Sequence, residues 1–279
     1  MKTFAKNRTM ETIRNTYYPN IKQAIGILLL FIFLSMIFGL ITSLGSLVEN
    51  GLLQNITLLL SYTLAAGGTV IIISRMKKTQ NPNIQVFMNY KPRIKSFIVT
   101  LFLTFAVIII TEPLTSLIPM PDSIKNLFET MFRPTIPAFI TAVIVAPILE
   151  ELIFRGIILE GFLRNYSPIK SILLVSLLFG LAHLNIWQFI GAFVIGAFIS
   201  WIYWKTRSIG LSIAVHMTNN LIGFLAMLFS SESFAETTIS DFTGNIEMYY
   251  VVSGISIVVL ALGFYYHKMW IGKKHDISR

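Results

Sequence analysis

Long apolar stretches separated by short polar connections run along the whole chain. Most of them reach the roughly 20 residues that a helix needs to cross the hydrocarbon core of a bilayer. The pattern predicts an all-α, polytopic membrane protein with eight transmembrane helices. The expected spans are Ile21–Leu44, Leu52–Ser74, Lys95–Leu117, Ile136–Leu163, Ile169–Leu184, Ile186–Trp204, Ile209–Phe229 and Met248–Trp270, of which Ile169–Leu184 is the shortest.

Composition supports a membrane protein and excludes several other classes. Hydrophobic residues make up 54% of the chain and charged residues only 13%, whereas soluble domains carry about 25% charged residues. The chain has no cysteine, which excludes disulfides, thiolate metal sites and a cysteine nucleophile. The first apolar stretch is too long for the h-region of a cleaved signal peptide, so we expect it to be a span. We therefore expect one transmembrane domain, residues 1–279.

The positions of the lysines and arginines predict the orientation. These residues collect in cytoplasmic loops of membrane proteins. If both termini are cytoplasmic, only Lys125 and Arg133 of the 22 cationic residues fall in outer segments, and Arg155 lies within a span. The last outer loop is instead acidic. The net charge of +9 thus reflects topology, and we expect the bilayer, not a nucleic acid, as the partner of this chain.

Two further patterns concern packing. Segment Ser123–Arg133 has the apolar spacing of an amphipathic helix and is expected to lie at the outer interface. Ala192, Gly196 and Ser200 form a stripe of small residues on the sixth span, which permits close approach of helices within or between chains. The oligomeric state is not determined by the sequence.

Ionisable and amide side chains inside three of the spans are the candidates for function. Such groups are costly in hydrocarbon, so each is a functional hypothesis. Glu150 lies 14 residues from Arg164, and His183 lies 13 residues from Lys170, which is roughly 20 Å of helix from a cytoplasmic charge. The remaining candidates are Glu151 and Arg155 on the fourth span and His216, Asn219 and Asn220 on the seventh, with Asn220 at the same depth. The common level predicts one polar cavity within the bundle.

Chemistry suggests distinct roles for the two glutamates. Glu151 and Arg155 are i, i+4 neighbours with the acid first, the favoured orientation for an ion pair. Neighbouring residues on a helix point about 100° apart, so we expect that the two glutamates do not both face one partner closely. Glu150, left without a local cation, is suited to take a proton from water beside an imidazole such as His183.

A pair of neutral donors lies on the seventh span. His216 and Asn220 are four residues apart and share a helix face. They could stabilise a developing oxyanion, although His and Asn also serve as hydrogen-bonding links between membrane helices.

Three motifs on successive spans resemble those of a known family. Residues 150–155 read EELIFR, which matches EExxxR; residues 179–183 read FGLAH, which matches FxxxH; residues 216–220 read HMTNN, which matches HxxxN. In this order they are similar to the CPBP family of CAAX prenyl proteases and bacteriocin-processing enzymes, also called Abi proteins. The resemblance implies an intramembrane glutamate-type endopeptidase without a metal cofactor, with its catalytic core in residues 136–229.

The resemblance also implies roles for the motif residues. It makes Glu150 the general base, acting with His183 on a water molecule, and makes His216 and Asn220 the oxyanion hole. Glu151 and Arg155 become a supporting ion pair. The expected substrate is a peptide or a membrane protein, and the brief loops favour a bacterial plasma membrane; the sequence does not choose among prenylated proteins, peptide precursors and other substrates.

Three alternatives stay open at the level of sequence. A zinc protease could use Glu150, His183 and His216 as ligands with water in the fourth position, although the chain lacks an H-E-x-x-H helix. The same polar residues could belong to a proton-coupled transporter, although no paired repeats are visible. A catalytically idle scaffold is the third alternative.

Overall fold

The computed structural model describes residues 17–47, 50–80, 85–87, 90–116, 118–124, 135–229 and 245–270. The elements that it forms in these ranges are helices. They are α1 (Ile21–Ser46), α2 (Gly51–Gln80), α3 (Ile94–Ser116), α5 (Ile136–Phe139), η1 (Ile140–Val145), α6 (Ala146–Glu151), η2 (Leu152–Leu159), α7 (Glu160–Asn165), α8 (Pro168–Leu181), α9 (Ile186–Thr206), α10 (Ile209–Phe229) and α12 (Ile246–Trp270). The segments α5 to α7 follow one another without a break, and η1 and η2 are π-helical.

The all-α membrane fold predicted from the sequence is confirmed. Among the described residues, seven helices are long and apolar enough to cross a membrane, and one of these is the continuous helix Ile136–Asn165. The eighth predicted span corresponds to α8, a shorter apolar helix of 14 residues. The count of eight crossings and the cytoplasmic position of both termini stay predictions.

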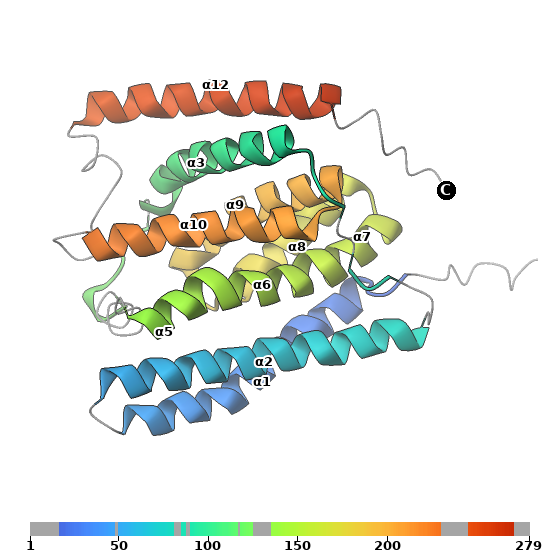
Figure 1. Ribbon diagram of the computed structural model, residues 1–279, viewed down its shortest axis with the longest axis vertical. Helices are drawn as coiled ribbons and strands as arrows, with labels where there is room; N and C mark the ends of the chain where they lie inside the picture. Colours follow the sequence, from blue (N-terminus) through green and yellow to red (C-terminus); the bar gives the residue numbers. More distant parts are fainter. Residues whose placement is uncertain are drawn as a thin grey trace, which may run out of the picture.

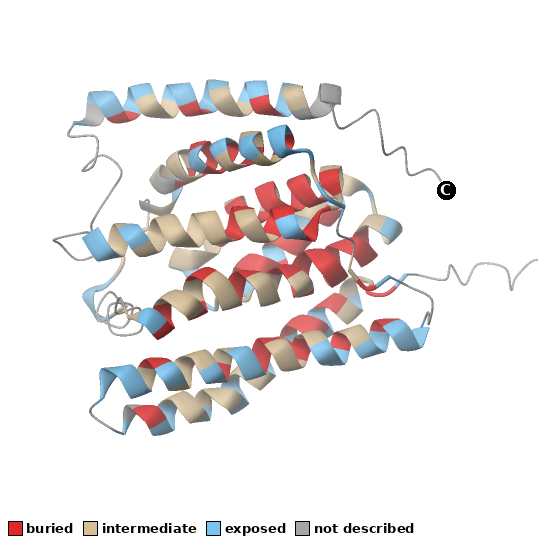
Figure 2. Cartoon of the chain, viewed as in Figure 1, coloured by how far each residue is buried: buried red, intermediate tan, exposed pale blue. Residues whose placement is uncertain are grey.

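The helices run along one another and form a bundle (Figure 1). The hairpin of α1 and α2 lies on one side, and α12 lies against α3 on the opposite side. The continuous helix α5–α7 lies between them with α8, α9 and α10. Buried residues concentrate in these central helices, whereas α12 is largely exposed (Figure 2). The candidate residues therefore lie on the elements that are packed on several sides.

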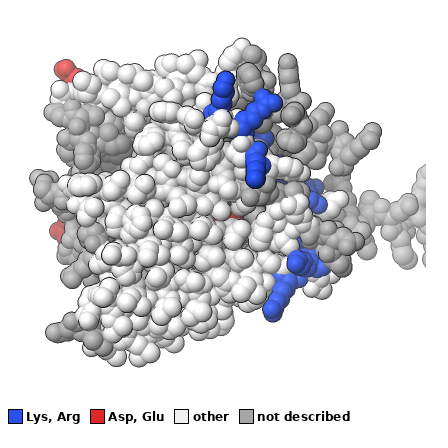
Figure 3. Space-filling model, viewed as in Figure 1, with Lys and Arg blue, Asp and Glu red and all other residues white. Residues whose placement is uncertain are grey.

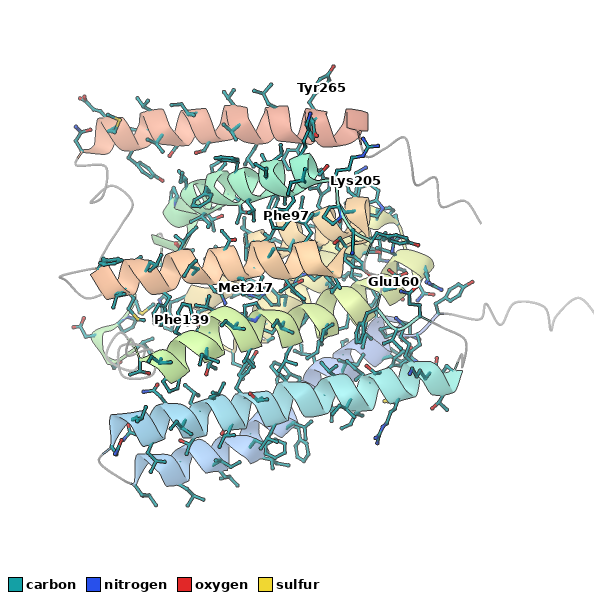
Figure 4. The ribbon with its side chains drawn as sticks, in the orientation of Figure 1. Phe97, Phe139, Glu160, Lys205, Met217 and Tyr265 are labelled. Carbon is teal, nitrogen blue, oxygen red and sulfur yellow. The ribbon has the colours of Figure 1, made fainter. Side chains whose placement is uncertain are left out.

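Cationic side chains gather at one end of the bundle. Figure 3 shows the described lysines and arginines that are visible in this view at a single end of the molecule. Glu160 and Lys205 lie toward this end, and Phe139 lies toward the other (Figure 4). This separation is the arrangement that the positive-inside rule describes.

Some predicted features lie wholly or partly outside the described residues. Of the predicted amphipathic segment Ser123–Arg133, only residues up to Ile124 are described, and residues 122–124 are helical. Lys125 and Arg133 lie outside the described ranges, as does most of the acidic loop before Glu247.

Candidate active site

A proline shapes the helix that carries the two glutamates. Pro147 stands in the first turn of α6, directly after the π-helical turn η1. Proline has no N–H and its ring crowds the preceding turn. The wider π-helical turn, in which the Ala146 N–H bonds to the Thr141 carbonyl, accommodates it. Single π-helical turns occur frequently at functional sites, and here two of them flank α6.

Asn220 bonds to the backbone at this irregular turn. In the π-helical register the carbonyl of Ala142 would accept from residue 147, and Pro147 has no hydrogen to give. Asn220 Nδ2 donates to that carbonyl instead, at 2.8 Å. The Asn220 Oδ1 in turn accepts from Asn219 Nδ2 at 3.1 Å. The side chain of Asn220 is therefore held against η1, with one of its two amide hydrogens used on Ala142.

The predicted ion pair of Glu151 and Arg155 is present. Arg155 Nη1 lies 2.8 Å from Glu151 Oε1, and both side chains are completely buried. Arg155 also donates to α9, from Nη2 to the Gly196 carbonyl at 2.9 Å and from Nε to Ser200 Oγ at 3.3 Å. A buried guanidinium with this many acceptors avoids the cost of an unpaired charge. The pair therefore also connects the helix of the two glutamates to α9.

The small-residue stripe on α9 receives this arginine. A Cβ atom at Gly196 would lie 3.0 Å from Phe179 Cδ1 and 3.3 Å from Arg155 Nη2. A larger residue would therefore push the guanidinium away from the carbonyl that it binds. Ala192 and Ser200 are buried on the same helix, so the stripe serves packing within this chain.

His216 lies between the two glutamates. Its Nδ1 is 2.8 Å from Glu151 Oε1 and its Nε2 is 3.8 Å from Glu150 Oε2. The expectation that the two glutamates do not share a partner closely is wrong, because an imidazole carries nitrogens on two sides and can face two carboxylates that point in different directions. If Glu151 is ionised, it only accepts hydrogen bonds, so the contact places a proton on His216 Nδ1.

Glu150 has a second partner that the sequence analysis missed. The hydroxyl of Tyr62 on α2 donates a hydrogen bond to Glu150 Oε1. Tyr62 lies 13 residues before Arg75, roughly 20 Å of helix, so the depth measure applied to the other candidates would have found it. The Glu150 side chain keeps 14% of its surface exposed, against 0% for Glu151. Of the two glutamates, Glu150 is thus the one accessible to a water molecule.

His183 lies on the turn between α8 and α9. The helix α8 ends at Leu181, earlier than expected, because Leu184 adopts a left-handed conformation (φ 57°) and Asn185 caps α9. His183 Nδ1 is 2.9 Å from the Phe179 carbonyl. Within the described residues, no hydrogen bond or ion pair joins His183 to Glu150.

The ring of Phe179 connects the two histidines. Its centroid lies 5.2 Å from that of His183 and 5.5 Å from that of His216, with both pairs nearly perpendicular. The guanidinium of Arg155 lies 4.6 Å from the same centroid, within the range of a cation–π contact. The FxxxH and HxxxN motifs therefore meet the EExxxR motif at one aromatic side chain.

The arrangement differs from the zinc site considered above. Among the residues that the structure describes, no three histidine, aspartate or glutamate side chains form a group suited to hold a metal ion. Glu150 and His216 come together, whereas the described contacts of His183 are with the carbonyl and the ring of Phe179.

The fold and this site define a polytopic membrane protein with a carboxylate–imidazole centre inside its helical bundle. Residues 132–222 match the family described as type II CAAX prenyl endopeptidase, Rce1-like. This match confirms the resemblance to the CPBP family over the segment that contains all three motifs. No curated protein and no solved structure matches the chain.

Proposed function

We propose that this protein is a CAAX-protease-like intramembrane endopeptidase in which Glu150 activates a water molecule. The observation that carries the proposal is the pairing of Glu150 Oε2 with His216 Nε2 at 3.8 Å, within the segment matched to CAAX endopeptidases. Among the described residues, no guanidinium bonds to the Glu150 carboxylate, and Arg155 of the same helix is bonded to Glu151. A carboxylate without a permanent counter-ion is suited to accept a proton.

The proposed reaction is direct hydrolysis. A water molecule in contact with Glu150 Oε2 and His216 Nε2 gives a proton to Glu150 as its oxygen attacks the carbonyl carbon of the peptide bond. The C=O bond becomes a single bond to an oxyanion. When the tetrahedral intermediate collapses, the C–N bond breaks and the proton passes to the leaving amine. No covalent bond to the protein forms.

The supporting residues follow from their contacts. Glu151 holds His216 through Nδ1, so that Nε2 faces Glu150. Asn220 has a second amide hydrogen besides the one bonded to Ala142, and this hydrogen is proposed to stabilise the oxyanion. His183 is proposed to assist Glu150 in activating the water molecule, the role that the family resemblance assigns to the FxxxH histidine.

The proposed substrate is a peptide segment of a protein or peptide at the membrane, and the proposed location is a bacterial plasma membrane. The family description suggests a first probe, namely a prenylated peptide ending in a CAAX sequence, compared with its unprenylated form. Purified protein in lipid nanodiscs should shorten the probe, as detected by mass spectrometry, and Glu150→Gln should not.

A second experiment tests for a natural substrate other than a prenylated peptide. New peptide termini in membranes of cells that express the wild-type protein should be absent from cells that express Glu150→Gln at the same abundance. If wild type and Glu150→Gln give the same products in both experiments, the proposed function is wrong.

A further inference from the structure

Tyr62 joins the candidate site from outside the matched segment. It lies on α2, seventy residues before residue 132, where the family match begins, and its hydroxyl donates to Glu150 Oε1. None of the three motifs includes a residue of α2. The helix nevertheless packs along α5, η1, α6 and η2, so a side chain of α2 can reach the carboxylate.

The position of Tyr62 is fixed by the α1–α2 hairpin. The neighbouring Ser61 is buried and donates to the Phe38 carbonyl of α1 at 2.7 Å, and it shares a hydrogen bond of 2.8 Å with Thr42. The ring of Tyr62 meets Phe31 of α1 edge to face, with centroids 6.4 Å apart. These contacts set the rotation of α2 and the direction of the Tyr62 ring. The hydroxyl is therefore presented to Glu150 by contacts that do not involve the motif helices.

The hydrogen bond has a consequence for the carboxylate. A carboxylate oxygen bonded to a tyrosine hydroxyl is held by a charge-assisted hydrogen bond, which opposes rotation of the group. With Oε1 of Glu150 occupied by Tyr62, Oε2 is the oxygen that faces His216 Nε2. The hairpin thus selects which oxygen is available to water.

We propose that Tyr62 is a positioning residue for Glu150, which holds Oε1 so that Oε2 acts as the base. The proposal rests on the proposed function in its catalytic part. Its structural part, the hydrogen bond and its effect on the carboxylate, can be tested without turnover.

The test removes the hydroxyl and keeps the ring. In Tyr62→Phe the edge-to-face contact with Phe31 is retained, so the variant should fold. The variant loses a hydrogen bond to a charged group, and with it stabilisation of the transition state. The kcat should therefore fall roughly 10- to 100-fold, with KM nearly unchanged. In the Glu150→Gln background the same substitution should have no further effect, because a residue that acts through Glu150 has nothing left to position.

The chain offers a matched control. Tyr203 also donates its hydroxyl to a buried carboxylate, Glu160 Oε2, at 3.3 Å, but it lies near the C-terminal end of α9. Tyr203→Phe removes a hydrogen bond of the same kind and should leave kcat unchanged. Equal losses of kcat in Tyr62→Phe and Tyr203→Phe would overturn the proposal, and so would a wild-type kcat in Tyr62→Phe. The proposal would also be wrong if Tyr62→Phe lowered kcat by the same factor in the Glu150→Gln background as in the wild type.

An infrared measurement separates this proposal from the proposed function. In protein labelled with ¹³C-glutamate, the carboxyl bands that are absent from Glu150→Gln belong to Glu150. These bands should shift in Tyr62→Phe and stay in place in Tyr203→Phe, whether or not a substrate is cleaved. Unshifted bands in Tyr62→Phe would show that the hydrogen bond is absent and would overturn the proposal, even if the enzyme is active.

Discussion

Two clusters of polar side chains surround glutamates of the continuous helix α5–α7, and these glutamates differ in their partners. The central cluster consists of Glu150, Glu151, Arg155 and His216, and the end cluster consists of Glu160, Arg164, Tyr203 and Arg207. In the end cluster, Glu160 receives Arg207 Nη1 at 2.5 Å, Arg164 Nε at 3.3 Å and the Tyr203 hydroxyl at 3.3 Å. Both of its oxygens therefore have a cationic partner.

In the central cluster, only one of the two glutamates pairs with the arginine. Of the two glutamates, only Glu151 bonds to Arg155, whereas Glu150 faces a tyrosine hydroxyl and an imidazole. A carboxylate that bonds to two guanidinium groups serves in structural ion pairs, whereas one beside a hydroxyl and an imidazole is suited to act as a general base. The comparison shows that the placement of arginine distinguishes the candidate base from a structural carboxylate of the same helix.

The largest expected contrast comes from changing one glutamate in each cluster. Glu150→Gln keeps the shape of the side chain and removes its basicity, so turnover should fall roughly 10²- to 10⁴-fold with little change in abundance. Glu160→Gln should instead lower abundance and thermal stability, because two arginines lose their anion, while turnover per folded molecule stays near wild type. Turnover normalised to folded protein separates the effect on catalysis from the effect on stability. Near wild-type turnover in Glu150→Gln would contradict the mechanism.

The second contrast compares the two i, i+4 ion pairs. Arg155→Ala leaves the fully buried Glu151 without its cation and should cost about 3–5 kcal/mol of stability. Arg164 keeps 33% of its side chain exposed, and Arg164→Ala should cost about 0–1 kcal/mol. Thermal unfolding of the two purified variants in the same detergent measures the difference. Losses of similar size would contradict the expectation that burial makes the Glu151–Arg155 pair contribute more to stability than the Glu160–Arg164 pair.

A third prediction concerns the oxyanion. Asn220→Ala should lower kcat roughly 10²- to 10³-fold with little change in KM, if its free amide hydrogen stabilises the transition state. Asn219→Ala removes only the donor to Asn220 Oδ1 and should have a smaller effect. An increase in KM alone for Asn220→Ala would assign this residue to substrate binding.

The smallest expected effect is that of metal removal. The central cluster is proposed to act without a metal ion, so treatment with a strong chelator should leave turnover within about two-fold of the untreated protein. Metal analysis of the same sample provides the control. Loss of activity on chelation, with recovery on adding zinc, would favour a zinc protease over the metal-free mechanism.

The sequence alone determined the features that depend on one helix at a time. The length of the apolar stretches predicted the helices, because a bilayer requires that length. The i, i+4 spacing predicted the ion pair of Glu151 and Arg155, because helix geometry brings such residues together whatever surrounds them. The same reasoning on single helices predicted a common depth for the motif residues, and the match to CAAX endopeptidases covers the segment that contains them.

The tertiary structure decided the features that depend on how helices are rotated against one another. The contact of His216 with both glutamates, the bond from Asn220 to the Ala142 carbonyl and the hydroxyl of Tyr62 on Glu150 each join two helices. Apolar side chains surround each span on nearly every side, so the hydrophobic pattern does not define which face turns inward. Packing between helices, set by contacts such as those of Ser61 with α1, fixes that rotation and with it the partners of Glu150.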